Sequence, residues 1–291
     1  MPGRRSWRVK ERAATVEVNG AQIAYEIEGA GPPVVFIHPG IADRRAFDPQ
    51  VEHFRDSYRC IRHDMRGFGA SDMPEGFYSH MEDLRVLMDT LKIERAHLVG
   101  ISLGGSVALE FAIRYRFRAI SLFLVGASVH GWPWGDAMEA YGKAEAALAA
   151  RHDLQGRVEL DMRTWVYGPT RGPGAIAPHL SLRIRSMVEG ANRRAADQAR
   201  GTHQWLDPPA LKRLRVIRAP TMVIWGKDDF EEIPPVGEHL AKTIRGARKA
   251  VIEDAAHLPN LERPQEFNRV LEQFLAEAGS ARLPTVGSSM H

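Results

Sequence analysis

The sequence contains a single cysteine and no long apolar run. Cys60 has no partner for an internal disulfide, which is typical of a reducing compartment, and its place in the strand-like stretch "YRCIRHD" predicts a buried, unreactive thiol rather than a nucleophile. The longest apolar runs, such as "ISLFLVG", are well short of the roughly 18 residues that a membrane-spanning helix needs. We therefore expect a cytoplasmic protein without a membrane span.

Signatures of metal, nucleotide and nucleic-acid binding are also missing. No histidine spacing such as H-E-x-x-H indicates a metal site, and neither G-x-x-x-x-G-K-[ST] nor a G-x-G-x-x-G after a strand is present to bind phosphates. The net charge is only +3, and the arginines are scattered instead of being interleaved with aromatic residues. The sequence thus predicts no metal, no cofactor and no nucleic-acid partner. A small-molecule substrate is expected, and the sequence leaves open whether the protein forms a homodimer.

The chain of 291 residues suits one large domain with an insertion. Residues 1–14 are basic, but no apolar segment follows them as in a signal peptide, so they are predicted to form a tail. Strand and helix patterns alternate over 15–130 and 211–280, which is typical of an α/β fold with a mostly parallel twisted sheet and helices on both faces. Glycine and proline clusters separate helical runs over 131–210, which predicts a helical cap. Residues 281–291 are expected to form a second tail.

Two local signals place elements within this frame. Asn19-Gly20 lies between two alternating runs and predicts a β-hairpin. Ser79, with Glu82 three residues later, predicts a capping box at the start of an amphipathic helix. These signals place the start of the sheet and one of the helices beside it.

The stretch "LVGISLGG" contains a G-x-S-x-G motif centred on Ser102, between a predicted strand and a predicted helix. A sharp strand-to-helix turn crowds its backbone, and glycines on either side let the turn close while the serine hydroxyl projects from the sheet edge. The motif alone fits two roles. Ser102 is either a nucleophile or a helix N-cap whose hydroxyl binds a backbone amide.

A serine nucleophile requires a base and an acid that orients the base. His257 follows one later predicted strand, and the adjacent Asp228 and Asp229 follow another. The carboxyl ends of parallel strands meet at one edge of a sheet, so these side chains are expected near Ser102. Adjacent loop residues point in different directions, and only one of the two aspartates is expected to reach the histidine.

Five segments resemble the α/β-hydrolase family, in the family's order along the chain: "VVFIHPG", "RHDMRGFGASD", "LVGISLGGSVALEFA", "APTMVIWGKDD" and "AAHLPNLERPQEFN". They cover nearly the whole chain outside the insertion. The resemblance implies that Ser102 is the nucleophile and His257 the base. It also implies that Asp229, three residues after Gly226, is the orienting acid rather than Asp228.

The same resemblance implies an oxyanion hole made of the backbone amides of Leu103 and Gly40. The sequence departs from the family's usual histidine-glycine pair at Pro39, which has no N–H to donate. Gly40 keeps its N–H, so the hole can survive this change. His38 is similar to a family histidine that braces the oxyanion loop.

A serine at this position implies acyl transfer to water through an acyl-enzyme, and not the aspartate chemistry of haloalkane dehalogenases and epoxide hydrolases. The predicted function is a serine hydrolase that cleaves an ester or lactone of a small, largely apolar molecule. It resembles small bacterial esterases and lactonases of the 3-oxoadipate enol-lactonase type. The alternatives are a carbon-carbon bond hydrolase of ring-cleavage diketones, a cofactor-free perhydrolase, and a ligand-binding member of the fold with little turnover.

Aromatic residues of the insertion are candidates for the wall of the substrate pocket, although they equally suit packing of the cap onto the core. The candidate pocket residues are His38, Ile41, Trp132, Trp134, Trp165, Tyr167, Trp205 and Leu258.

Overall fold

The computed structural model describes residues 10–198 and 200–280. Within them, eight strands form one central sheet in the order β1-β2-β4-β3-β6-β7-β9-β10. The strands are β1 (Lys10–Val18), β2 (Ala21–Glu28), β3 (Pro33–Ile37), β4 (Arg59–His63), β6 (Ala96–Ile101), β7 (Ala119–Val125), β9 (Thr221–Gly226) and β10 (Arg248–Ile252). The β1–β2 and β2–β4 pairs are antiparallel and the other neighbours are parallel. The predicted α/β fold with a mostly parallel sheet is confirmed.

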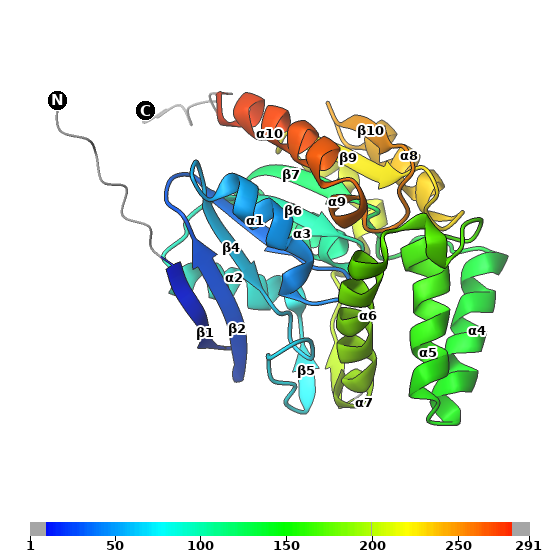
Figure 1. The fold of residues 1–291 in the computed structure, drawn as a ribbon. Coiled ribbons are helices and arrows are strands. Elements are labelled where there is room, and N and C mark those ends of the chain that lie inside the picture. Colours follow the sequence, from blue (N-terminus) through cyan, green and yellow to red (C-terminus); the bar gives the residue numbers. More distant parts are fainter. Residues whose placement is uncertain (1–9, 199, 281–291) are drawn as a thin grey trace, which may run out of the picture.

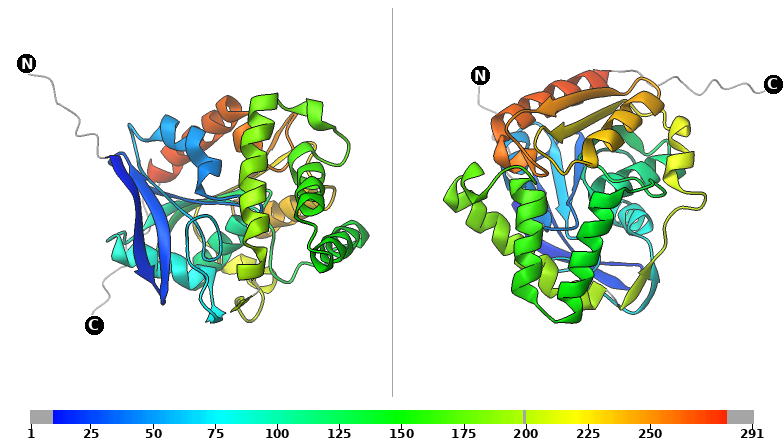
Figure 2. Two further views of the ribbon diagram at one scale, coloured as in Figure 1. Left: turned by 60° about the horizontal axis from the view of Figure 1, so that its bottom comes forward. Right: turned by 90° about the vertical axis from the view of Figure 1, so that its right-hand side faces the viewer.

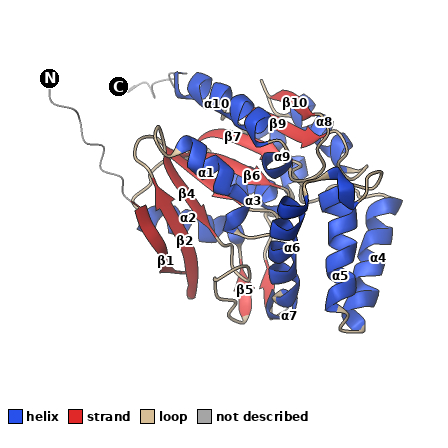
Figure 3. Cartoon of the chain, in the orientation of Figure 1, coloured by secondary structure: helices blue, strands red, loops and turns tan. Residues whose placement is uncertain are grey.

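Helices cover both faces of this sheet (Figures 1 and 3). One apolar cluster joins one face to α2 (His80–Thr90), α3 (Leu103–Arg114) and α8 (Ile233–Thr243). A second cluster joins the opposite face to α1 (Asp48–Phe54), α9 (Pro259–Glu262) and α10 (Pro264–Ser280). Among the helices that the structure describes, none combines the length and apolar content of a membrane span.

Strand β3 illustrates why the central strands are apolar almost without interruption. Val35 and Ile37 belong to the first cluster, whereas Val34 and Phe36 belong to the second. Successive side chains of a strand point to opposite faces, so a strand that is covered on both faces needs apolar residues at every position.

The segment between β7 and β9 is mostly helical and stands beside the carboxyl ends of the strands (Figures 1 and 2). Its helices are α4 (Asp136–Ala150), α5 (Leu154–Asp161), a π-helical turn (Met162–Tyr167), α6 (Pro178–Arg193) and α7 (Ala195–Gln198). Short 3-10 helices lie at Arg44–Phe47, Pro173–Ala175, Ala210–Lys212 and Leu214–Val216. We call residues 131–210 the cap.

A small parallel sheet connects the cap to the core. Strand β5 (Gly76–Tyr78) comes from the loop after β4, and β8 (Gly201–His203) comes from the end of the cap. The sequence analysis finds neither strand, because each has only three residues and no alternating apolar pattern. It also misses α1, which lies between β3 and β4.

The hairpin prediction is confirmed and the capping-box prediction is wrong. Asn19 and Gly20 both have positive φ, 47° and 76°, as a type I′ turn requires. Ser79 is the N-cap of α2, but its side chain makes no capping hydrogen bond. Glu82 accepts hydrogen bonds from Tyr115 and Arg85 instead of reaching back to the N-cap. A tertiary contact with Tyr115 and a local ion pair with Arg85 have therefore replaced the capping box.

The predicted N-terminal tail is too long. Strand β1 begins at Lys10, so residues 10–14 belong to the sheet. The remaining tail assignments, 1–9 and 281–291, lie outside the described residues.

Candidate active site

Ser102 stands at the turn between β6 and α3 with a strained backbone. Its φ of 54° and ψ of −114° place a non-glycine residue in a sparsely populated region, which is typical of a nucleophile elbow. The Ser102 amide donates to the carbonyl of Val125 at 2.8 Å, which fixes the turn against β7. The residue occupies the N-cap position of α3, but its hydroxyl makes no capping hydrogen bond. The helix-cap role is therefore not the one that the geometry supports.

Glycines on either side allow the elbow to pack. A Cβ on Gly104 would lie 2.1 Å from the Ile37 carbonyl oxygen, and a Cβ on Gly100 would lie 2.3 Å from the Gly104 carbonyl oxygen. Both distances are far below van der Waals contact. The turn after β6 can therefore press against the end of β3 only if these positions carry no side chain.

Asp229 and His257 form a buried pair at the ends of β9 and β10. The His257 Nδ1–H donates to the Asp229 carboxylate, with distances of 2.9 and 3.0 Å to its two oxygens. A carboxylate only accepts, so the Nδ1 of His257 carries the proton. In the neutral ring, Nε2 then keeps the lone pair of a base. The Asp229 side chain is fully buried, which fixes this orientation.

Asp228 lies in a different environment from Asp229. Its carboxylate is 3.6 Å from the Arg171 guanidinium, and Arg171 also donates to Glu262 at 2.6 Å. Glu262 in turn accepts from the Ala256 amide, in the residue before the histidine. The structure thus brings Asp229, and not Asp228, to His257.

Gly126 lies where the serine turn and the Asp229–His257 pair meet. It directly follows Val125, to which the Ser102 amide is bonded, and a Cβ on Gly126 would be 3.1 Å from both Asp229 Oδ2 and His257 Nδ1. Within the described residues, no hydrogen bond joins the Ser102 hydroxyl to His257. Catalytic hydrogen bonds are often long without substrate and shorten in the reactive complex.

The two residues of the predicted oxyanion hole lie close together. A Cβ on Gly40 would lie 3.6 Å from the Leu103 side chain. Leu103 is the first residue of α3, where an amide has no partner within its own helix. In the described part of the chain, the Gly40 amide donates to no backbone carbonyl or side chain either. Both N–H groups are thus free to bind an anionic oxygen.

His38 holds the loop that carries Gly40. Its Nε2 accepts the Met65 amide at 2.9 Å, so its Nδ1 is the donor to the Pro39 carbonyl at 2.8 Å. Burial lowers the pKa of His38, which favours this neutral ring. Both nitrogens are occupied by backbone, so His38 has no lone pair left for a second base.

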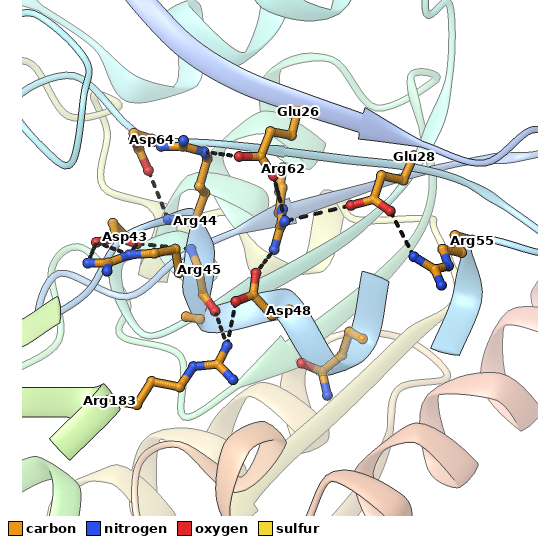
Figure 4. A network of polar contacts seen from close by, with 12 residues as sticks. Glu26, Glu28, Asp43, Arg44, Arg45, Asp48, Arg55, Arg62, Asp64 and Arg183 are labelled. Carbon is orange, nitrogen blue, oxygen red and sulfur yellow. Dashed lines mark hydrogen bonds and ion pairs between the residues drawn. The ribbon is translucent and has the colours of Figure 1, made fainter. Parts of the chain in front are cut away.

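Charged side chains fix the residues that follow this loop (Figure 4). Asp64 accepts from the Arg44 amide at 2.8 Å and also binds the Arg44 side chain. Arg183, from cap helix α6, donates to Asp48 at 2.5 Å and to the Arg45 carbonyl at 3.1 Å. The segment that follows the oxyanion loop is therefore tied both to the end of β4 and to the cap.

Trp165 connects the cap to the histidine. Its ring centroid is 4.8 Å from that of His257, and its carbonyl accepts the His257 amide at 3.2 Å. It lies on the π-helical turn Met162–Tyr167, and such turns are rare and often occur at functional sites. Among the tryptophans and the tyrosine predicted for the pocket, Trp165 is the one with a ring contact to the predicted base, His257.

The other predicted pocket residues are spread over several environments. Ile41 lies beside Gly40 and lines a cavity of about 280 Å³ under the cap. His38 and Leu258 are fully buried, so they offer no surface to a ligand. Trp132 and Trp134 pack against the first apolar cluster, and Trp132 also contacts the His239 ring. Tyr167 belongs to the second cluster and its hydroxyl is bonded to Ser181, whereas Trp205 stacks on His130.

The wall of that cavity is more polar than expected. Its cap side includes Tyr141, Arg157, Asp161 and Asn192, none of which the sequence analysis selects. No motif marks them, because they come from three helices and meet only when the cap folds. Their polar character departs from the apolar pocket predicted from the tryptophans.

Two further predictions can be compared with the structure. Cys60 is buried in β4, and burial raises the pKa of its thiol to about 12, so it is unreactive as expected. Among residues 10–198 and 200–280, there is no group of three or more His, Cys, Asp or Glu side chains arranged to hold a metal ion.

The fold and the serine turn define a class, and the comparisons agree. A profile of the alpha/beta hydrolase family matches residues 34–270. The chain belongs to this family.

The individual relatives of this chain include an enol-lactonase and a dienoate hydrolase. The chain is 27% identical over 272 residues to 3-oxoadipate enol-lactonase 1 of Acinetobacter baylyi, covering 91% of this chain and 93% of the relative. It is 30% identical to 2-hydroxy-6-oxo-6-phenylhexa-2,4-dienoate hydrolase of Comamonas testosteroni, covering 88% and 91%. The crystal structure of the enol-lactonase from Burkholderia xenovorans superposes with a TM-score of 0.74 at 28% identity, covering 90% of this chain and 100% of that one. These similarities support a hydrolase.

Proposed function

We propose that the protein is a serine hydrolase that cleaves a carboxylic ester or lactone, with Ser102, Asp229 and His257 as its catalytic triad. The observation that carries this proposal is that the strained serine turn and the oriented Asp229–His257 pair meet at Gly126. The free amide of Leu103 directly follows Ser102, and Gly40 lies beside the Leu103 side chain. If Ser102 were only a helix cap, neither the oriented histidine nor the free amides would be needed.

In the first half of the reaction, Ser102 Oγ attacks the carbonyl carbon while His257 Nε2 takes the hydroxyl proton. The Leu103 and Gly40 amides stabilise the negative oxygen of the tetrahedral intermediate, and each such donor contributes on the order of 10²- to 10³-fold in rate. The carbon–oxygen bond to the leaving group breaks, and the leaving oxygen receives the proton from His257. The product is an ester between the acyl group and Ser102.

Water completes the reaction. His257 accepts a proton from the water as its oxygen attacks the acyl carbon, and then returns the proton to Ser102 Oγ as that bond breaks. Asp229 keeps the imidazole oriented and stabilises its positive charge in both halves. For a lactone the leaving oxygen stays attached to the acyl group, so one hydroxy acid is released.

A second candidate is hydrolysis of 2-hydroxy-6-oxo dienoates. It is favoured by relatives with that name, which are 28 to 30% identical to this chain. Direct comparison of kcat/KM for such a dienoate and for a lactone separates the two reactions. The ester or lactone proposal predicts the higher value for the lactone.

Labelling with a fluorophosphonate tests the nucleophile. We expect the intact protein to gain the mass of one probe less HF, because fluoride leaves as the serine oxygen bonds to phosphorus, and the Ser102→Ala variant to gain none. Ser106→Ala, on the same helix but bonded to Ser128, is the matched control and should label like the parent. If the wild type gains no mass and Ser102→Ala still hydrolyses p-nitrophenyl esters and lactones, the proposal is overturned.

A further inference from the structure

The cavity of about 280 Å³ lies between the oxyanion loop and three cap helices. It shares Gly40 with the proposed oxyanion hole. On the cap side, the Tyr141 ring lies 5.3 Å from Trp165, whose ring contacts His257 at 4.8 Å. Two independent contacts thus place the cavity next to the reaction centre, where the acyl part of a substrate would extend.

One wall of the cavity is a satisfied polar network around Asp161. The Tyr141 hydroxyl donates to Asp161 Oδ1 at 2.6 Å, and the Asn192 amide donates to Asp161 Oδ2 at 2.7 Å. Burial raises the pKa of both Asp161 and Tyr141. Each carboxylate oxygen has a second lone pair, so Asp161 can accept one more hydrogen bond from a ligand.

A donor is available on the neighbouring turn of α5. Arg157 Nη2 is bonded to Glu145 at 2.6 Å, whereas the Arg157 Nε is buried and, among the described residues, has no partner. A buried N–H without a partner costs about 1 to 3 kcal/mol. An acceptor atom of a ligand would remove that cost.

The charges of this wall disfavour an anion. Two carboxylates, Asp161 and Glu145, face one guanidinium, and the guanidinium is already paired with Glu145. A ligand carboxylate would meet Asp161 without a free counter-charge. An uncharged group has no such penalty.

We propose that this cavity binds an uncharged group that both donates and accepts a hydrogen bond, such as a secondary amide or an alcohol, on the acyl side of the substrate. The group accepts from Arg157 and donates to Asp161. This inference rests on the proposed esterase or lactonase function and specifies its substrate class.

The test uses p-nitrophenyl esters with one leaving group and matched acyl chains. Three series end in a secondary amide, in an alkyl group of the same length, or in a carboxylate, with the end group at increasing distance from the ester. At the best distance we expect kcat/KM for the amide to exceed that of the alkyl ester about tenfold, the factor for one hydrogen bond of about 1.4 kcal/mol. The carboxylate ester should have the lowest kcat/KM.

Variants assign this selectivity to the cavity. Asp161→Asn and Glu145→Gln should each raise the carboxylate-to-amide ratio of kcat/KM about tenfold, because each removes one negative charge. Glu159→Gln removes the same charge from α5, but on its exposed side, where Glu159 pairs with Arg185, and should leave the ratio unchanged. A ratio between two substrates does not depend on how much of a variant is folded.

The experiment separates failure of the cavity inference from failure of the hydrolase proposal. If p-nitrophenyl acetate and all three series are left intact, the hydrolase proposal itself fails. If the esters are cleaved but the carboxylate series is preferred, or if both cavity variants keep the wild-type ratio, the inference about the uncharged group is overturned while the hydrolase proposal stands.

Discussion

The reaction centre and the cap cavity face each other but are built in different ways. At the reaction centre, each side chain follows its own strand, and backbone packing at Gly104 and Gly126 sets the positions. In the cavity, side chains from α4, α5 and α6 converge, and hydrogen bonds between them set the positions. The first arrangement tolerates almost no change in backbone shape, whereas the second can change its chemistry by single substitutions. Reaction type and substrate choice are therefore separable.

The largest expected effect is at the reaction centre, where the two adjacent aspartates can be compared. Asp229→Asn should lower kcat by about 10⁴-fold, because the histidine loses its orienting carboxylate. Asp228→Asn should change kcat by less than about tenfold, since Asp228 contacts Arg171 and not His257. Steady-state kinetics on a p-nitrophenyl ester decides the matter, and the opposite ranking would reassign the acid.

Glycine substitutions compare backbone tolerance in the two regions. Gly104→Ala should lower the free energy of unfolding by about 3 kcal/mol or more, since its Cβ would collide with the Ile37 carbonyl. Gly190→Ala, inside cap helix α6 with nothing within 4 Å, should raise it by about 0.5 to 1 kcal/mol. Urea unfolding measures both, and equal effects would refute the contrast.

The burial of Glu110 on α3, beside Leu206 at the end of the cap, makes the stability of the fold depend on pH. The Glu110 carboxylate accepts the Leu206 amide at 3.2 Å, and His130 Nδ1 lies 3.7 Å from it. Burial raises the pKa of Glu110 from 4.5 to about 7. The folded state therefore holds this proton more tightly than the unfolded chain, and the stabilisation is complete below pH 4.5 and lost as the pH rises through 7.

The variant Glu110→Gln should remove this pH dependence. At pH 8 we expect its free energy of unfolding to exceed that of wild type by about 2 to 3 kcal/mol, and at pH 5 by much less. Glutamine retains the oxygen that accepts the Leu206 amide. Urea titrations at both pH values provide the measurement, and a difference that does not change with pH would contradict the assignment.

The smallest expected effect concerns the ion pair that ties the cap to the start of α1. Arg183→Gln should lower the free energy of unfolding by at most about 1 kcal/mol, because the Arg183 and Asp48 side chains are both 40% exposed. Thermal unfolding in low and high salt checks this, since screening should shrink the difference. A large loss would mean that this contact, and not apolar packing, holds the cap.

Much of the molecule can be derived from local sequence. The apolar strands, the Asn19-Gly20 turn and the glycines around Ser102 all act through contacts or backbone shapes that a few neighbouring residues specify. Chain order also places Asp229 and His257 after their strands. Two predictions failed or were missed. Strands β5 and β8 are too short to show a period, and the capping box does not form: Ser79 makes no capping hydrogen bond, and Glu82 is bonded to Tyr115 and Arg85.

The sequence by itself therefore determined the fold class and the residues of the candidate triad, because motifs in parallel α/β proteins follow individual strands. The family resemblance favoured Asp229 over Asp228, but two adjacent loop residues differ only in direction, so the contact between Asp229 and His257 is seen only in the tertiary structure. The tertiary structure also decided the wall of the cap cavity. Tyr141, Asp161 and Asn192 are far apart in the chain, and their shared hydrogen bonds exist only after three helices have packed together.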